Sequence, residues 1–278
     1  KVGGVVVTGT DNVLISMFVG IKQVGLYSNY QLIISGLNTI YGIAFQSFTA
    51  SIGNLGATET KERNRFIFEC INFLGFWIYG FSSICLMILL NSFINLWLGK
   101  DYLFPMSLVL IIVVNFYLTG MRKSVLTFKD ALGLFWYDRY KPLFEASINL
   151  VISIILAQYF GTSGIFIGTI ISILTTCFWI EPYVLFKYGF EESVISYFRK
   201  YIYYSFIMIL AGIITVLISS IFSNYTLSGF ISKLLVCLTV PNVLFFVVFR
   251  RTKEFQYLFK ITKPMIYRIF KIIKVKYK

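Results

Sequence analysis

The sequence has no histidine and few charged residues. The absence of His among its 278 residues excludes a histidine-ligated metal site and an imidazole general base. Charged residues make up 13% of the chain, about half of their share in an average soluble domain. That is too little charge to cover the surface of a soluble protein of this size. These shortages, together with 58% apolar residues, exclude an ordinary soluble enzyme and a disordered chain.

Cysteine pairs and catalytic motifs are also absent. The four cysteines are widely spaced, form no CxxC pair and each lie inside an apolar run, which predicts four packing residues. The chain contains no Walker motif, GxGxxG, HExxH or nucleophile elbow. We therefore expect no enzymatic activity, no metal site and no cofactor.

Apolar sequence, by contrast, is abundant. Mean hydropathy is +0.79, and the chain contains 29 Phe and 19 Tyr. A hydrocarbon core about 30 Å thick needs about 20 helical residues. Eight apolar runs suit that requirement: residues 2–20, 25–52, 66–90, 105–122, 142–160, 164–186, 201–222 and 228–249. This predicts an all-α fold, a polytopic transmembrane bundle of about eight helices.

The basic residues predict how the bundle is oriented. Of the 25 lysines and arginines, 22 fall on one side of the predicted membrane: at residue 1, within 53–65, 122–141 and 187–200, and from 250 onward. The other three are Lys22, Lys100 and Lys233. By the positive-inside rule both ends are cytoplasmic and the chain crosses eight times. We interpret the net charge of +13 as facing anionic membrane lipid, not nucleic acid.

The chain divides into three predicted parts. Residues 1–186 form a six-helix unit, and residues 187–249 form two additional transmembrane helices with an interfacial linker. Residues 250–278 form a basic tail in which apolar residues alternate with cations, a pattern typical of an amphipathic helix on the inner leaflet. Segment 187–200 resembles a shorter version of it. Because the chain begins with Lys, not Met, we expect it to start partway through a longer protein.

The first span carries a carboxylate. Asp11 and Asn12 lie about 13 Å from the outer end of the span at Gly20, near the midplane. Thr8 and Ser16 are predicted to lie on the same side of the helix. Ionisable residues within a bilayer usually face protein or a water-filled cavity. Asp11 and Asn12 are therefore candidates for ion binding, and the alternative is an Asp that pairs with a neighbouring helix for packing alone.

The second span carries a longer polar stripe. Its members follow steps of 4, 4, 3, 4 and 4 and are predicted to share one face over about five turns: Tyr27, Gln31, Ser35, Asn38, Gly42 and Gln46. Amides and hydroxyls on one face suit a hydrated cavity that admits sugar hydroxyls. The alternative is a set of interhelical hydrogen bonds. Asn29, Tyr30 and Asn115 are further polar candidates.

Charged residues also lie near the inner ends of the spans. Arg122 and Lys123 end the fourth span, where they either snorkel to the surface or reach a phosphate at the mouth of a cavity. Glu181 precedes a proline near the inner end of the sixth span, and we expect its carboxylate to reach water.

Two further patterns predict contacts around the fifth span. Glu145 is positioned to pair with Arg139 or Lys141. Gly164 and Gly168 form a GxxxG motif, which indicates close helix packing.

Four segments carry a resemblance to a known family: TGTDNVLISMFVG, VGLYSNYQLI, FINLWLGKDY and FWIEPYVLFKYGF. With these segments the chain resembles bacterial polysaccharide flippases, which export O-antigen or capsule repeat units. Their superfamily also includes the lipid II flippases and the multidrug and toxin extrusion transporters. The resemblance implies two related lobes of six helices, with this chain as the second lobe plus two extra helices. The family's N-terminal lobe is missing from this sequence.

The resemblance also implies a mechanism and partners. Two lobes would rock about a midplane site and move an undecaprenyl-pyrophosphate-linked oligosaccharide outward across the bacterial cytoplasmic membrane. Asp11 would bind the coupling H⁺ or Na⁺, and Arg122 or Lys123 would contact the diphosphate. The partners would be the lipid-linked oligosaccharide, membrane lipid and the missing lobe of the same chain.

Three other functions stay open. A multidrug or small-cation antiporter of the same superfamily would share the fold and differ in cargo. A membrane-embedded glycan polymerase or glycosyltransferase needs a sizeable catalytic loop, whereas outer loop 91–104 carries only Lys100 and Asp101. A non-transporting membrane scaffold is the third alternative.

Overall fold

The computed structural model describes residues 2–223 and 226–263, and it describes side chains from Thr10 onward with the exception of Ala57. Every regular element in this part of the chain is helical. In chain order the elements are α1 (Val2–Phe18), α2 (Ile21–Thr58), α3 (Lys61–Trp97), η1 (Lys100–Tyr102), α4 (Met106–Ala131), η2 (Leu134–Asp138), α5 (Lys141–Ser172), η3 (Ile173–Cys177), α6 (Phe178–Val184), η4 (Leu185–Phe190), α7 (Ile195–Ser219) and α8 (Leu227–Phe249). The predicted all-α fold is confirmed.

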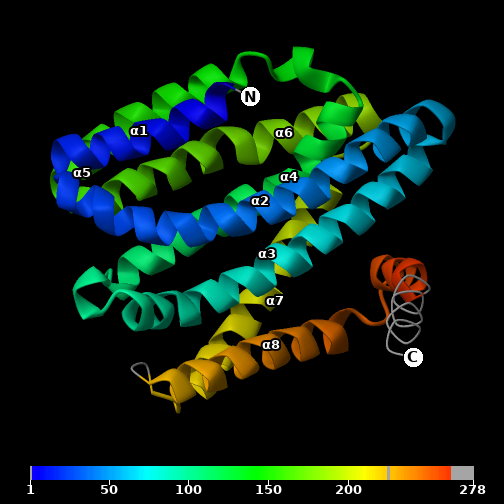
Figure 1. Cartoon of the computed structure of the whole chain (residues 1–278). Coiled ribbons are helices and arrows are strands. Elements are labelled where there is room, and N and C mark those ends of the chain that lie inside the picture. The colour runs from blue at the N-terminus through cyan, green and yellow to red at the C-terminus, as the bar shows by residue number, and fades with distance from the viewer. Residues whose placement is uncertain (1, 224–225, 264–278) are drawn as a thin grey trace, which may run out of the picture.

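The α5 element is a hairpin of two helical arms. Gly161 adopts φ 54° and ψ −133° in its middle, a backbone conformation that favours glycine, and the chain reverses there. The arms 141–160 and 162–172 then lie antiparallel, since Ser153 Oγ donates to the Ile165 carbonyl at 3.1 Å. The second arm continues through η3, α6 and η4. Within the described residues, α5 thus supplies one arm for each of the two predicted runs 142–160 and 164–186 (Figure 1).

Among the residues that the structure describes, five stretches are long and apolar enough to cross a membrane. They are α3, α4, the stretch Leu134–Phe190 that contains the hairpin, α7 and α8. This is consistent with a helical membrane bundle. Of the other two helices, α1 has 17 residues and α2 carries the polar stripe. The number of crossings and the orientation of the ends stay predictions.

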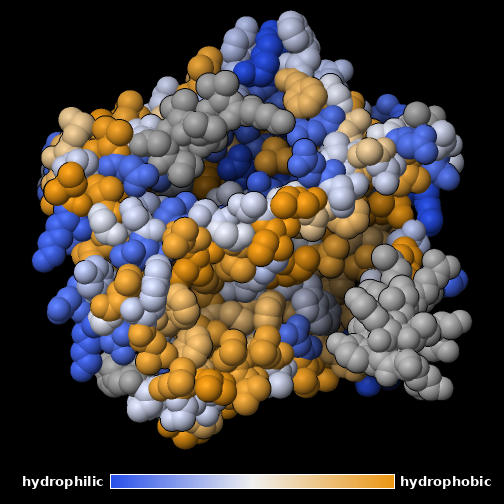
Figure 2. Space-filling view, viewed as in Figure 1, coloured by the Kyte–Doolittle hydropathy of each residue, from blue (hydrophilic) through white to orange (hydrophobic). Residues whose placement is uncertain are grey.

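The arms are arranged in two groups. In Figure 1, α1, α2, α5 and α6 lie together with α4 beside them, and α7 and α8 pack against α3. Figure 2 shows hydrophilic side chains around a hollow in the upper part of this face, over the first group. Hydrophobic side chains cover most of the lower part, over α3 and α8. The first group therefore holds the polar residues that bear on function.

One expectation for the predicted inner surface needs revision. Segment 187–200 does not form a separate interfacial helix: its first residues belong to η4, and residues from Ile195 belong to α7. The prediction is wrong because the apolar face of this segment packs in the core, with Tyr197 only 4% exposed. A helix over 253–263 begins the tail, with Phe255 stacked on Trp77. Residues 264–278, which hold most of the predicted amphipathic helix, lie outside the described residues.

The GxxxG motif does mark close packing. A Cβ on Gly168 would come within 2.8 Å of the Ser153 backbone, and one on Gly164 within 2.1 Å of the Leu156 carbonyl oxygen. The two arms of α5 thus touch backbone to backbone, and only glycine fits at these two positions.

Near the connection between α3 and α4, Tyr30 joins three segments. Its side chain is fully buried, its hydroxyl donates to Asn91 Oδ1 at 2.6 Å, and it accepts from the Phe104 backbone N–H at 2.8 Å. Asn91 Nδ2 in turn donates to the Phe104 carbonyl at 2.9 Å. This polar contact fixes α2 and α3 to the loop before α4, so Tyr30 has a structural role.

We predict that Tyr30→Phe lowers the free energy of unfolding by about 1–3 kcal/mol, because it leaves buried groups on Asn91 and Phe104 without a partner. Thermal or denaturant unfolding of the purified protein measures the loss. Tyr102→Phe, at an exposed tyrosine near the same surface, is the control. Equal stability of the two variants would contradict the role assigned to Tyr30.

Candidate functional site

A cavity of about 230 Å³ lies between α1, α2, α4 and both arms of α5. We call it the central cavity. Its polar lining residues are Asp11, Tyr27, Gln31, Asn38, Asn115, Thr119, Arg122, Glu145 and Thr169. The structure therefore brings together polar side chains from four helices that are far apart in the sequence.

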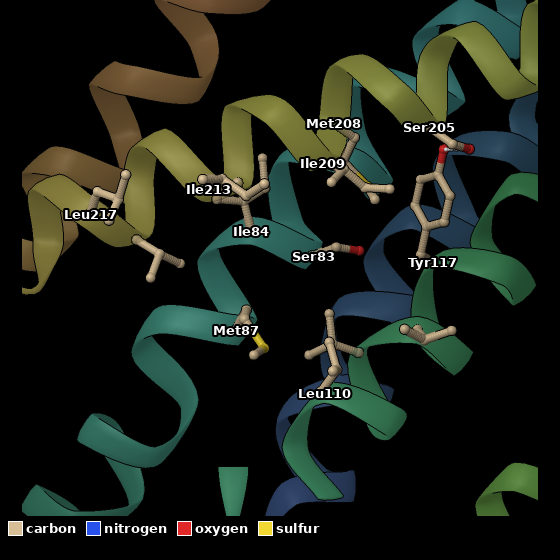
Figure 3. Close-up of a pocket in the computed structure, with 14 residues that line it drawn as sticks. Ser83, Ile84, Met87, Leu110, Tyr117, Ser205, Met208, Ile209, Ile213 and Leu217 are labelled. Atoms are coloured by element: carbon tan, nitrogen blue, oxygen red, sulfur yellow. Dashed lines mark hydrogen bonds between the residues drawn. The ribbon is translucent and has the colours of Figure 1, made fainter. Parts of the chain in front are cut away.

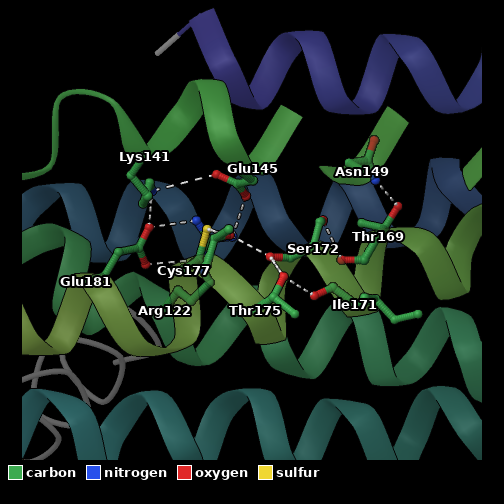
Figure 4. Close-up of polar contacts among 11 residues, drawn as sticks. Arg122, Lys141, Glu145, Asn149, Thr169, Ile171, Ser172, Thr175, Cys177 and Glu181 are labelled. Atoms are coloured by element: carbon green, nitrogen blue, oxygen red, sulfur yellow. Dashed lines mark hydrogen bonds and ion pairs between the residues drawn. The ribbon is translucent and has the colours of Figure 1, made fainter. Parts of the chain in front are cut away.

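Asp11 is buried in this cavity with little hydrogen bonding. Its side chain is 6% exposed, and Thr169 Oγ1 donates to Asp11 Oδ1 at a long 3.5 Å. No other hydrogen bond to this carboxylate occurs within the described part of the chain. Asn149 Nδ2 donates to Thr169 Oγ1 at 3.0 Å, which places an amide, a hydroxyl and a carboxylate in a row (Figure 4 shows the first two).

This row has the chemistry to hold a proton or a small cation. A carboxylate away from water is stable when it is neutral or paired with a cation. Oxygen atoms of a carboxylate, a hydroxyl and an amide are the ligands that hard cations prefer. In the residues that the structure describes, no group of three or more His, Cys, Asp or Glu side chains forms a metal site.

The rest of the predicted α1 stripe lies elsewhere. Asn12 and Ser16 are exposed and do not line the central cavity. The prediction that they share one side with Asp11 is wrong, because successive helical residues turn by about 100°, so Asn12 lies about 100° and Ser16 about 140° from Asp11. Thr8 lies among the residues whose side chains are not described.

The α2 stripe divides for the same reason. Tyr27, Gln31 and Asn38 line the cavity, and the Tyr27 hydroxyl donates to Gln31 Oε1 at 2.8 Å. Ser35 and Gln46 are exposed and lie outside the cavity. The mean step of the stripe exceeds 3.6 residues, so Ser35 and Gln46 have rotated by about 80° and 100° from Tyr27. The single-face prediction is therefore correct for three of these five residues.

An ion-pair network lies at the end of the cavity that Arg122 and Glu145 line (Figure 4). Arg122 donates to both carboxylate oxygens of Glu181, from Nε at 3.0 Å and from Nη2 at 2.7 Å. Lys141 Nζ also donates to Glu181 Oε1. Glu145 lies 3.3 Å from Arg122 Nη1 and 3.7 Å from Lys141 Nζ.

This network corrects two expectations. The Glu181 side chain is 0% exposed, so its carboxylate does not reach water; the two cations from α4 and α5 compensate its burial instead. Glu145 pairs with Lys141, one of its two predicted partners, and with Arg122, which the sequence did not indicate. Arg139 takes no part in the network.

A larger cavity of about 620 Å³ continues from the central cavity toward the end of α4. The two share Thr119, Arg122 and Glu145 in their linings. We call this one the basic cavity, because five cationic side chains line it: Arg122, Lys123, Lys129, Arg139 and Lys141. Of the two predicted phosphate contacts, Lys123 faces this cavity and Arg122 faces both, bound to Glu181.

Four residues of the site escaped the main sequence predictions, and one of them is Thr119 in α4. Thr169 and Asn149 lie in the α5 hairpin, and Asn115, a weaker candidate, donates from Nδ2 to the Phe166 carbonyl at 3.1 Å. Asn149 lies one helical turn from Glu145, and this spacing was the sequence pattern that could have indicated it as a site residue. Thr169 follows Gly168 in an apolar segment and has no such signal.

An apolar cavity of about 520 Å³ lies apart from the polar ones, between α3, α4 and α7 (Figure 3). Met87, Leu110, Ile209 and Ile213 are among its lining residues. At one end the hydroxyls of Tyr117 and Ser205 approach to 3.1 Å. Its surface suits hydrocarbon and not a sugar or an ion.

Comparison with protein-family models, with curated proteins and with solved structures gave no match to this chain.

Proposed function

We propose that this chain is one lobe of an ion-coupled exporter that moves an undecaprenyl-pyrophosphate-linked oligosaccharide repeat unit across the bacterial cytoplasmic membrane by alternating access. Both chain ends would lie in the cytoplasm, as the basic residues predict. The observation that carries the proposal is the buried Asp11, which faces a polar cavity within a membrane bundle.

The surroundings of the cavity support a lipid-linked cargo. The basic cavity at the inner end offers cations to a diphosphate. The apolar cavity between α3, α4 and α7 offers a surface to a polyprenyl chain. A cargo with a polar head and an apolar tail needs both kinds of surface.

Exposed polar residues on α1 and α2 support a partner lobe. Asn12, Ser16, Ser35 and Gln46 are exposed in this chain, and exposure of such groups to lipid is unfavourable. A second six-helix lobe facing α1 and α2 would place them beside protein or in a hydrated central passage.

We expect Asp11→Asn and Asp11→Ala to reduce export at least about tenfold, which is within the usual range for loss of coupling between two ligands. The neutral side chain can no longer exchange H⁺ or balance Na⁺. The assay measures surface polysaccharide, and lipid-linked repeat units retained in the inner leaflet, in a deletion strain that carries each variant. Imposed proton and sodium gradients identify the ion.

The control is Asp101→Asn, at an exposed carboxylate outside the cavities. Full export by both Asp11 variants, with an unchanged dependence on ion gradients, would refute the coupling role. Normal glycan export in the deletion strain, together with increased sensitivity to cationic drugs, would instead favour a multidrug antiporter.

A further inference from the structure

Three of the five cations that line the basic cavity are bound by carboxylates. Arg122 and Lys141 are bound by Glu181. Lys129 Nζ forms an ion pair with Asp138 Oδ2, and both side chains are less than a tenth exposed. Their charges are thus compensated within the protein, which weakens their attraction for an external anion.

Lys123 and Arg139 differ from these three. Neither forms an ion pair with any residue that the structure describes, although the charge of Asp130 acts on Lys123. Arg139 is exposed, with Cζ 3.9 Å from the ring centroid of Trp136 and 4.7 Å from that of Tyr140. Its Nη1 donates to the Trp136 carbonyl at 3.2 Å, so most of the five N–H donors of the guanidinium are available to a ligand.

The position of these two cations in the bundle indicates which anion is near. Lys123 lies 17 residues after Met106, about 26 Å along α4, close to the inner edge of a 30 Å hydrocarbon core. Arg139 follows η2, beyond the end of α4. The large exposed side chains beside it are Phe135, Trp136, Tyr137 and Tyr140. Aromatic residues of this kind collect in the interface between hydrocarbon and water, where the abundant anions are lipid phosphates.

We infer that Lys123 and Arg139 bind the phosphate of a lipid headgroup at the mouth of the basic cavity. The planar guanidinium donates paired hydrogen bonds to phosphate oxygens, and the ammonium supplies a point charge from α4. Phe135, which also lines the cavity, provides apolar contact for the part of the lipid next to the phosphate. This site goes beyond the proposed function, because an integral phospholipid and a lipid-linked diphosphate share the chemistry that it recognises.

Titration of lipids into the purified full chain in neutral detergent tests the site. The probes are phosphatidylglycerol, undecaprenyl diphosphate and phosphate-free diacylglycerol, and bound lipid is counted by native mass spectrometry. We expect Lys123→Gln combined with Arg139→Gln to weaken binding of at least one phosphate lipid about tenfold or more, the result of losing two charge-assisted contacts. Arg251→Gln combined with Lys253→Gln removes the same charges from exposed positions in the tail and should leave the affinity unchanged.

The two phosphate lipids identify the source. Selective binding of phosphatidylglycerol indicates a resident phospholipid, selective binding of undecaprenyl diphosphate indicates cargo, and either supports the site. The proposed site would be overturned if diacylglycerol bound as tightly as the phosphate lipids. Wild-type lipid affinity in the Lys123→Gln/Arg139→Gln variant, or an equal loss of affinity in the tail variant, would overturn it as well. The variant Lys123→Arg with Arg139→Lys keeps both positive charges and should keep lipid binding. It therefore distinguishes a loss of phosphate recognition from a loss of binding caused by misfolding. Because lipid binding alone is measured, the result does not depend on whether the protein exports a glycan.

Discussion

Glu181→Gln is expected to lower the free energy of unfolding by about 3–5 kcal/mol, the usual result of removing one partner from a buried ion pair. The Glu181 carboxylate accepts two hydrogen bonds from Arg122 and one from Lys141. Without its charge, the two cations retain only the more distant Glu145. Thermal unfolding can be monitored by the rate at which a thiol reagent labels the cysteines, because none of the four free cysteines is exposed in the folded chain.

The control for this variant is Glu191→Gln. Glu191 pairs with Lys61 at 2.6 Å, but both side chains are more than half exposed, so its loss should cost at most about 1 kcal/mol. Arg122→Gln added to Glu181→Gln should recover part of the stability, because it removes the uncompensated charge. If Glu181→Gln proved no more destabilising than Glu191→Gln, the network would not be the determinant of stability that its burial indicates.

Gly168→Ala is the second substitution from which we expect a large effect, a loss of about 3 kcal/mol or more. The new Cβ would lie 2.2 Å from Ser153 Oγ and 2.8 Å from the Ser153 backbone. A backbone atom cannot move aside as a flexible side chain does, so the two arms of α5 must separate. Because these arms carry Asn149 and Thr169, the proposed ion-dependent export should fall together with the melting temperature.

The matched control for Gly168→Ala is Gly42→Ala in α2, where a Cβ would meet nothing within 4 Å. This variant should be neutral or gain up to about 1 kcal/mol, from the higher helix propensity of alanine. Wild-type stability of Gly168→Ala would mean that the arms of α5 are not in backbone contact.

The fold was largely predictable because each span is a long apolar run. Residues 2–20 and 228–249 correspond to α1 and α8 within a few residues. The second span extends beyond its predicted 25–52 to Thr58, since its polar inner turns remain helical outside the apolar run. The break at Gly161 was predicted as a short loop, and the structure reduces it to a single residue with a positive φ.

The site was predictable only where one residue is chemically unusual. Asp11 stands out as a carboxylate in an apolar run, and the structure places it in a cavity. The ion pairs that compensate the buried charge of Glu181 were not predictable, because Arg122 and Lys141 lie 59 and 40 residues away in the sequence. In α1 the prediction that the polar residues share one face failed because Asn12 and Ser16 lie one and five residues from Asp11, and in α2 it failed because a step of four residues is longer than one helical turn. The resulting drift is small over one step and large over five.

The length of the α2–α3 hairpin has a mechanical consequence. Its two helices have 38 and 37 residues, or about 57 Å each, longer than the roughly 45 Å of a whole bilayer with its headgroups. Phe45 and Tyr79 join the two helices at one height, with ring centroids 6.2 Å apart, and Tyr30 joins them at another through its hydrogen bond to Asn91. If the hairpin moved as one body, a rotation of about 15° at its middle would displace its tip, some 28 Å away, by about 7 Å.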